Sequence, residues 1–410
     1  MGVISNVLSA GHYYQIGLDN VIYQFQMEDR VSKKISIGFP IMREEPGEKR
    51  VFLPDFIRKM TEIGFEVFIE EGYGNSLNFY YDDYKNDNPQ IHPLEREEIF
   101  KQDYVLILRS PHDDEFSLFG KNSCLISMLH YPTHPLRRKI MGKNNIQAIS
   151  LDSIMDDFNL RLVENMKSVA WNGLEAAFTQ FEKYIPNLIR EDGTPWKVLV
   201  IGTGMVGKQA VEAASKLGRK ERNNEHIRLG GPGVIVNSVG RNIASHAEQM
   251  IALFTQSDII VDSTQRHDPS KPIIPNEWIA YLPEHAIVVD LSVDPYTPET
   301  IPPVVKGIEG IPHGSLDQFV FEKDDPNWEK TIPKSIPTKN RRKAISCYSW
   351  PGIHPESCMR HYGQQLLPLM RVLFKKNYHT LSPDGLYFER ALFRARLDSF
   401  VKRKPDQKKI

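Results

Sequence analysis

A short glycine-rich segment carries the clearest chemical signal in the chain. The segment reads Gly202, Thr203, Gly204, Met205, Val206 and Gly207. It follows an apolar run typical of a strand and opens a stretch typical of a helix. In that setting the first glycine permits a tight turn, the second lets the backbone approach a pyrophosphate, and the third lets the helix meet the strand. The spacing predicts a dinucleotide phosphate site, against the alternative of a glycine cluster that only shapes a loop.

The residues expected to contact the nucleotide ribose include no carboxylate. The strand after the glycine segment ends in Asn237 and Ser238, and Arg241 follows. A carboxylate here would accept a hydrogen bond from the ribose 2′-hydroxyl and repel a 2′-phosphate. Its absence, with Ser238 and Arg241 as donors, favours NADP(H) among the NAD(P)H cofactors. The alternative for Arg241 is an ordinary solvated charge.

Two further strand ends of the same series carry short polar side chains. Ser263 and Thr264 follow one strand and are candidates for contact with the cofactor ribose. The candidates after the next strand are Asp290, Leu291, Ser292 and Asp294. The period of two places the polar members of this group on one face, where a nicotinamide would project, and Asp290 is also a catalytic candidate. Turn stabilisation is an equally good reason for these residue types.

Three residues of the N-terminal half have side chains suited to a substrate. Arg50 lies in a loop, Arg109 ends a strand, and His130 comes just after another strand. An arginine can hold a carboxylate in a bidentate fork, and a histidine can move the proton that accompanies hydride transfer at a carbon bearing nitrogen. Taken singly, each also has a structural reading, a surface ion pair for the arginines and a loop hydrogen bond for the histidine.

Strand and helix patterns alternate along the chain, which predicts an α/β fold with doubly wound, mostly parallel sheets. The strands are expected at residues 35–40, 65–70, 104–108, 123–128, 146–151, 197–201, 234–236, 258–261 and 286–290. Helices are expected at residues 54–63, 163–184, 208–217, 355–375 and 385–401. The last two helices are candidates to cover the first sheet. The polar insert at 218–233 is expected to be a solvated loop.

Length and composition limit the classes of function. A chain of 410 residues is long enough for two hydrophobic cores. The net charge of −1 disfavours nucleic acid or a membrane surface as partner and leaves a small-molecule substrate. The cysteines Cys124, Cys347 and Cys358 do not have metal-site spacing and indicate reduced thiols in a cytoplasmic protein, and we expect no metal site. No apolar stretch is long enough to span a bilayer.

Several ordered pieces of residues 35–375 resemble the alanine dehydrogenase and pyridine nucleotide transhydrogenase superfamily. The pieces are Gly38-Phe39-Pro40, Glu48-Lys49-Arg50-Val51, Glu70 to Gly74, Leu108 to Pro111, His130, the glycine segment and Val288 to Asp294. The chain is also similar to the lysine-forming saccharopine dehydrogenases and carboxyethylornithine synthases. That second similarity depends on the segment from Ile345 to Gly352 and on Leu366 to Pro368.

The resemblance implies a domain organisation and a reaction. It implies a discontinuous substrate domain at 35–163 plus 350–410 and a Rossmann NAD(P)-binding domain at 164–349. Residues 1–34 lack clear periodicity and are expected to be an N-terminal extension, which departs from the family pattern. Hydride would pass between NAD(P) and a substrate C–N bond, with Arg50 holding the substrate carboxylate and His130 acting as acid/base. Members of the family commonly form oligomers, so we expect a homo-oligomer.

One residue departs from the pattern of these families. Arg109 stands where they usually have lysine, and arginine stays charged at working pH. Proton transfer would then depend on His130, while Arg109 would bind a carboxylate or stabilise an oxyanion. Two other hypotheses stay open: a nucleotide-responsive binding protein without turnover, and a soluble transhydrogenase-like component.

Overall fold

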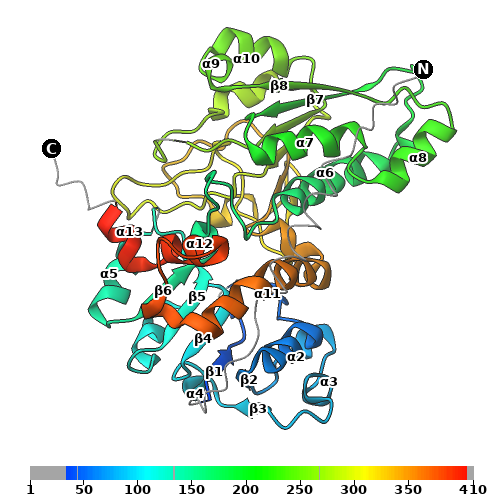
Figure 1. Ribbon diagram of the computed structural model, residues 1–410. Helices are drawn as coiled ribbons and strands as arrows, with labels where there is room; N and C mark the ends of the chain where they lie inside the picture. Colours follow the sequence, from blue (N-terminus) through cyan, green and yellow to red (C-terminus); the bar gives the residue numbers. More distant parts are fainter. Residues whose placement is uncertain (1–33, 44, 133, 267, 404–410) are drawn as a thin grey trace, which may run out of the picture. The chain divides into compact units, whose positions relative to one another are not determined.

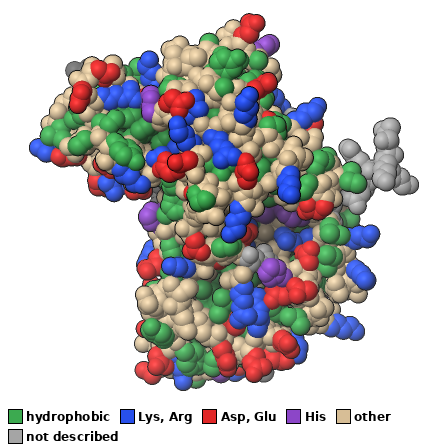
Figure 2. Space-filling model, turned by 180° about the vertical axis from the view of Figure 1, so that it is seen from behind, with side chains coloured by type: hydrophobic (Ala, Val, Ile, Leu, Met, Phe, Trp, Pro, Cys, Tyr) green, Lys and Arg blue, Asp and Glu red, His purple; other side chains and the backbone are tan. Residues whose placement is uncertain are grey.

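A computed structural model of the chain describes residues 34–43, 45–132, 134–266 and 268–403 (Figure 1). The predicted N-terminal extension lies outside the described residues except for Lys34. Residues from Ser36 onward belong to one compact unit, and everything that follows concerns them. On the face seen in Figure 2, basic and acidic side chains are interspersed.

The first sheet is parallel throughout, with strand order β3-β2-β1-β4-β5-β6. Its strands are β1 (Ser36–Phe39), β2 (Glu66–Glu70), β3 (Ile91–Leu94), β4 (Tyr104–Arg109), β5 (Cys124–Met128) and β6 (Gln147–Ser150). All but the edge strand β3 were predicted. The strand order reverses between β1 and β4, and ligands of open α/β sheets bind beyond the carboxyl ends at such a switch point. The loops after β1 and β4 are therefore the expected site in this sheet.

Helices from both ends of the described chain cover the first sheet. They are α2 (Pro54–Ile63), α3 (Tyr81–Lys85), α4 (Arg96–Ile99), α5 (Pro135–Lys143), α11 (Pro355–Thr380), α12 (Tyr387–Ala395) and α13 (Leu397–Arg403). The C-terminal α11 returns to this sheet, as predicted, and Figure 1 shows it beside β1 and β4. The Tyr104 hydroxyl donates to the Leu373 carbonyl at 3.2 Å, and the Phe65 and Phe374 rings lie 4.9 Å apart.

The predicted single helix at 385–401 is wrong, because the chain breaks at Arg396 into α12 and α13. Arg396 has extended backbone and forms an antiparallel bridge with Ile149 of the edge strand β6. Its guanidinium pairs with Asp398 in the first turn of α13. A backbone bridge to the edge of the sheet thus interrupts the helix at Arg396. Hydrophobic periodicity in the sequence does not reveal this interruption.

The second sheet has strand order β11-β12-β10-β9-β7-β8 and is parallel except for β11. Its strands are β7 (Trp196–Ile201), β8 (Val234–Val239), β9 (Ile259–Asp262), β10 (Ile287–Asp290), β11 (Val320–Phe321) and β12 (Lys343–Ser346). The sequence did not predict β11 or β12, and β8 is longer than expected. The order reverses between β7 and β9, so the glycine segment after β7 lies at the switch point of this sheet.

Helices pack on both faces of the second sheet. They are α6 (Met166–Glu182), α7 (Met205–Ser215), α8 (Lys220–Arg228), α9 (Arg241–Ala244) and α10 (Ala247–Phe254). Leu174 and Phe178 of α6 join one buried cluster with the β7 side chain of Val198. Met250 and Phe254 of α10 belong to a second cluster. Short 3₁₀ helices are at Asn75–Leu77, Asp113–Leu118, Leu151–Ser153, Pro186–Leu188, Asn276–Tyr281, Trp328–Thr331 and Trp350–Ile353.

The prediction of a solvated loop at 218–233 is also wrong, because the insert contains α8. Arg222 is buried and donates to the Glu182 carboxylate at 3.0 and 2.9 Å. His226 is buried as well, with Nδ1 2.9 Å from the Asn187 carbonyl and Nε2 accepting from the Gly233 N–H. The buried face of this helix is polar, so it has no apolar periodicity by which the sequence could be recognised.

Candidate functional site

The glycine turn has the geometry that its sequence predicts. Gly202 has φ of +112°, and a Cβ there would lie 2.7 Å from Ser263 Oγ. A Cβ on Gly207 would lie 2.0 Å from the Gly202 carbonyl oxygen, so the helix meets the turn too closely for a side chain. A Cβ on Gly204 would meet nothing within 4 Å. The first and third glycines are required by contact, whereas the second faces open space that a pyrophosphate would fit.

The start of α7 offers backbone donors beside this open space. The Lys208 N–H closes the first helical hydrogen bond, to the Gly204 carbonyl at 3.0 Å. The N–H groups of Met205, Val206 and Gly207 come before it, and groups in this position have no partner within their own helix. Thr203, Gly204 and Met205 are exposed. Such a helix start favours an anion.

The predicted ribose residues lie at the rim of the same turn. Asn237, Ser238 and Arg241 are exposed, and β8 is tied to the turn because the Gly202 N–H donates to the Val239 carbonyl at 2.9 Å. A Cβ on Gly240 would lie 3.9 Å from the Thr203 side chain of the turn. These residues are therefore accessible to the ribose end of a dinucleotide.

Asp290 lies at the predicted carboxyl edge but is enclosed by the protein. One carboxylate oxygen accepts from Lys306 Nζ at 2.6 Å and from the Ser346 hydroxyl at 3.1 Å. The other accepts from the Ser292 N–H and hydroxyl at 3.0 and 2.9 Å. Burial opposes ionisation, but the Lys306 ammonium holds the pKa of Asp290 below its ordinary value. The Asp290 and Lys306 side chains are both fully buried. Asp290 is therefore suited to positioning other residues.

The strand β9 places a second buried carboxyl group next to this pair. Asp262 Oδ1 accepts from the Thr264 N–H and hydroxyl at 2.9 and 2.7 Å, while Oδ2 has no partner among the described residues. Burial, together with the Asp290 charge, raises the pKa of Asp262 to about 6. The Ser263 hydroxyl donates to the Ile201 carbonyl at 2.9 Å. The Ser263 hydroxyl thus supports the start of the glycine turn, and the Thr264 hydroxyl supports the end of β9 through Asp262.

The other residues predicted after β10 differ in accessibility. Leu291 is buried and belongs to the core of the second sheet. The Asp294 side chain is 35 % exposed and accepts from Arg266 Nη2 at 2.8 Å. Burial raises the pKa of Asp294, and Arg266 opposes that shift. Asp294 is therefore the more accessible carboxylate at this edge.

Arg50, the expected carboxylate-binding residue, already holds a carboxylate of the chain. Its Nε donates to Glu48 Oε1 at 2.9 Å, and its Nη2 pairs with Glu48 Oε2. The two side chains are only 3 and 2 % exposed. Burial opposes the ionisation of Glu48, but the hydrogen bonds from Arg50 hold the pKa of Glu48 below its ordinary value. This pair is closed and bidentate.

Arg109 forms a looser pair at the end of β4. Its Nη2 is 3.3 Å from Glu45 Oε1, and the two side chains are 33 and 28 % exposed. The guanidinium carbon lies 5.1 Å from the centre of the Tyr348 ring, which brings a residue after β12 to the first sheet's switch point. Burial raises the pKa of Glu45, and Arg109 opposes that shift. One long contact is all that Glu45 has with this arginine.

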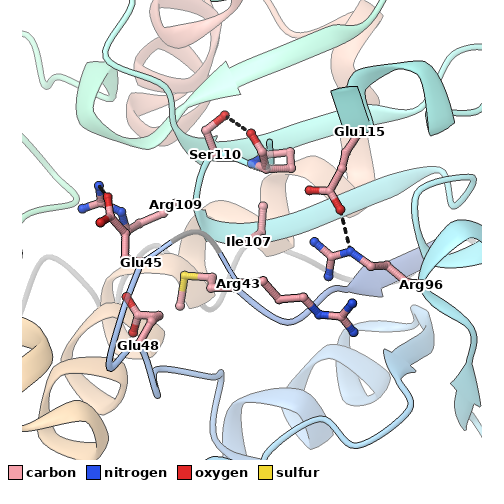
Figure 3. Close-up of a pocket in the computed structure, with 10 residues that line it drawn as sticks. Arg43, Glu45, Glu48, Arg96, Ile107, Arg109, Ser110 and Glu115 are labelled. Atoms are coloured by element: carbon pink, nitrogen blue, oxygen red, sulfur yellow. Dashed lines mark hydrogen bonds and ion pairs between the residues drawn. The ribbon is translucent and has the colours of Figure 1, made fainter. Parts of the chain in front are cut away.

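Glu48 of the closed pair and both members of the Arg109–Glu45 pair line a small pocket beyond the carboxyl ends of β1 and β4 (Figure 3). Arg109, Glu45 and Glu48 lie on one side of it, and Arg96 and Glu115 on the other. Arg96 Nε donates to Glu115 at 2.6 Å. The lining is therefore rich in paired charges, which suits a small polar molecule.

His130 is oriented by a buried carboxylate. Its backbone is left-handed, with φ of +48°, and its N–H donates to Asp152 Oδ1 at 3.0 Å. The ring Nδ1 lies 3.5 Å from Asp152 Oδ2, and the side chain is 48 % exposed. Burial opposes the ionisation of Asp152, but hydrogen bonds from His130 and Ser150 hold its pKa well below its ordinary range. The result is an accessible imidazole with one nitrogen facing an anion, two residues beyond Met128, which pairs with Arg109.

Several residues near the carboxyl edges of the two sheets were not predicted from the sequence. Lys306 carries no motif, and only its ion pair with Asp290 reveals it. Glu45 and Tyr348 also gave no signal, because their contacts with Arg109 join separate loops. Asp152 was visible only as part of an acidic turn. Among the described residues, no three His, Cys, Asp or Glu side chains gather as a metal site would require, and no helix is long and apolar enough to cross a membrane.

Fold and site together define an α/β protein of two domains, one of which has a dinucleotide-type turn at its switch point. The chain belongs to the alanine dehydrogenase/PNT family. The model of the family's N-terminal domain matches residues 41–170, and that of its C-terminal domain matches residues 191–296. Together these matches cover more than half of the chain. The family predicted from the sequence is thereby confirmed.

Individual relatives agree with this assignment. The chain is 21 % identical to NAD(P) transhydrogenase subunit alpha of Haemophilus influenzae, over 85 % of this chain and 68 % of that protein. It is 23 % identical to alanine dehydrogenase 1 of Staphylococcus aureus, over 70 % of this chain and 80 % of that protein. A solved L-alanine dehydrogenase matches 88 % of this chain and 94 % of its own with a TM-score of 0.64 and 18 % identity. A transhydrogenase from Sinorhizobium meliloti matches 83 and 96 % with a TM-score of 0.56 and 17 % identity.

Proposed function

We propose that the protein is an NAD(P)-dependent oxidoreductase that acts on a CH–NH bond of an amino acid or of an opine-type secondary amine. One observation carries the proposal: the glycine turn leaves open space only at Gly204, beside the donors that begin α7. Relatives are named alanine dehydrogenase and NAD(P) transhydrogenase, and both names imply a pyridine nucleotide. The nucleotide would supply the hydride acceptor or donor.

In this proposal the chain's own residues handle the proton and the carboxylate. His130, oriented by Asp152, takes up or releases the proton that accompanies hydride transfer. Arg109 is our first choice for the substrate carboxylate, because its contact with Glu45 is long and open to solvent. Arg50 keeps the role that the family resemblance implies only if Glu48 gives up its bidentate contact.

The other details belong to the same proposal. Ser238 and Arg241 favour NADP(H), since no carboxylate of the β8 end would repel a 2′-phosphate. We also keep the domain boundaries at 163/164 and 349/350, a cytoplasmic location and a homo-oligomeric assembly. Asp290 acts in this scheme by fixing the edge through Lys306 and Ser346 rather than by touching the substrate.

The first experiment is a calorimetric titration with NADH and NADPH, followed by an absorbance screen of amino acids with pyruvate, 2-oxoglutarate and glyoxylate. Gly204→Asp is the matched variant, because its side chain has room but places bulk and negative charge in the phosphate space. Gly142→Asp is the control, since that glycine also has nothing within 4 Å of a Cβ. Loss of nucleotide binding in Gly204→Asp alone is the expected result. No binding by the unaltered chain would end the proposal.

The role of His130 has a separate test. His130→Ala should lower the rate by roughly 100-fold or more and leave nucleotide affinity nearly intact, because the imidazole moves a proton in the chemical step. Steady-state kinetics and the same titration measure the two effects. Nucleotide binding without turnover in the unaltered protein would favour the nucleotide-responsive binding protein. Hydride exchange between nucleotides alone would favour the transhydrogenase-like component.

A further inference from the structure

A second histidine lies at the carboxyl edge of the second sheet, in the loop between β10 and β11. The backbone of His313 is fixed on both sides. Its N–H donates to the Thr331 hydroxyl at 2.8 Å, and the carbonyl of the next residue, Gly314, accepts from the Tyr348 N–H at 3.0 Å. A Cβ on Gly314 would lie 1.8 Å from the Ser346 carbonyl oxygen, so this loop passes directly over the end of β12.

The imidazole ring of His313 forms no hydrogen bond with the described residues. Nδ1 is buried and has no partner among the described residues. No hydrogen bond of Nε2 is formed with the part of the chain that is described, and the side chain is only partly buried. Polar groups in the protein interior are nearly always hydrogen-bonded to protein or water. Because Nδ1 is enclosed by the protein, Nε2 is the ring nitrogen that another molecule can contact.

Burial, more than the surrounding charges, favours the neutral form of His313. Burial, assisted by the positive charges of Lys306 and Arg109 and opposed by Asp290, lowers the pKa of His313 to about 4. Near neutral pH the ring is therefore uncharged, with one nitrogen that donates and one that accepts.

The contacts of Tyr348 connect His313 to the proposed substrate residues. The Tyr348 backbone bonds to the residue after His313, and the Tyr348 ring lies under the Arg109 guanidinium. Arg109 is also close enough to His313 for its charge to act on the ring. The His313 and Arg109 side chains thus lie in a common environment, although they belong to segments of different sheets.

We infer that His313 is a substrate-binding residue that donates a hydrogen bond from Nε2 to a carboxylate of the substrate, alongside Arg109. This inference rests on the proposed function and adds a residue that none of the sequence motifs contains. An anion is the chemistry that fits, because the ring offers a donor and the positive charges of Lys306 and Arg109 act at the same place. Water is the other molecule that could satisfy the ring, and the test separates the two.

The test compares His313→Leu, which has no hydrogen-bonding group, with His313→Gln, whose amide reaches about as far as Nε2. The acid that gives turnover with the unaltered protein, pyruvate or 2-oxoglutarate, is the probe. We expect His313→Leu to raise KM for that acid roughly 10- to 100-fold, the loss of one hydrogen bond to a charged group. His313→Gln should recover most of the loss. His92→Leu, in the edge strand β3, is the control.

Nucleotide affinity, measured by titration, should stay within about twofold of the unaltered value in all variants. An unchanged KM in His313→Leu would overturn the inference, and so would a fall in kcat without a change in KM. If the unaltered protein neither binds nucleotide nor turns over, the proposed function fails first and this inference fails with it. If His313→Leu does not fold, NMR provides a second test. The imidazole signal of His313 is the one that is absent from the spectrum of His313→Gln. We expect this signal to shift when the acid is added to the nucleotide-bound protein. A signal that does not move would overturn the inference.

Discussion

Two arginine–glutamate pairs contribute side chains to the same pocket, Glu48 from one pair and Arg109 with Glu45 from the other, and the pairs differ in their exposure to solvent. Arg50 and Glu48 form a bidentate pair that is 3 and 2 % exposed. Arg109 and Glu45 share one contact of 3.3 Å and are 33 and 28 % exposed. A buried pair loses much when one partner is removed, whereas an exposed pair contributes little. The difference teaches that the same two residue types can form a closed structural pair or an open pair, and for the open pair we propose substrate binding.

The largest expected effect is the loss of the closed pair's cation. Arg50→Met should lower the free energy of unfolding by about 3–5 kcal/mol, because Glu48 would remain buried without its partner. Urea-induced unfolding measures this change. Arg109→Met is the matched variant and should cost less than about 1 kcal/mol. Equal losses in both variants would remove the distinction between the pairs.

A smaller effect is expected when the anion of the closed pair is neutralised. Glu48→Gln should cost about 1.5–3 kcal/mol near pH 7, because the hydrogen bonds from Arg50 would lose their charged acceptor. The folded-state pKa of Glu48 lies below its ordinary value of 4.5. Its ionisation therefore stabilises the fold above that value, and this stability is lost as the pH falls through the folded-state pKa. Unfolding measured from pH 7 to pH 3 should show the variant and the unaltered protein converging, and a constant gap would contradict the assignment.

The smallest effect, of opposite sign, is expected for the open pair. The folded-state pKa of Glu45 is raised above 4.5. Its carboxyl group therefore favours the fold at low pH, and that contribution is lost as the pH rises through the folded-state pKa. Glu45→Gln should be neutral or stabilising by about 0.5 kcal/mol or less near pH 7. It should also lower KM for the keto acid, because Glu45 would no longer compete for Arg109, and a raised KM would show that Glu45 assists binding.

The sequence predicts apolar and glycine-defined features well and polar packing poorly. Most strands that bury branched aliphatic side chains were found, as was the turn from Gly202 to Gly207, but β3 and β12, which bury Ile91 and Ile345, were missed. The helix α8 was missed because Arg222 and His226 fill its buried face. Asp290 was expected at an open edge, but Lys306 encloses it from a loop 16 residues away. No local pattern announces such a partner.

The sequence alone determined the α/β class, the glycine turn and the family, because these depend on local periodicity and on short motifs in fixed order. Only the tertiary structure decided which charged side chains are exposed to solvent and accessible to a ligand. Arg109 meets Tyr348 across more than two hundred residues of chain, and His313 is influenced by charges at the ends of β10 and β4, strands of different sheets. The physical reason is that the desolvation of a charge depends on every group around it. A side chain's type states what it can do, and its burial decides whether a ligand can reach it.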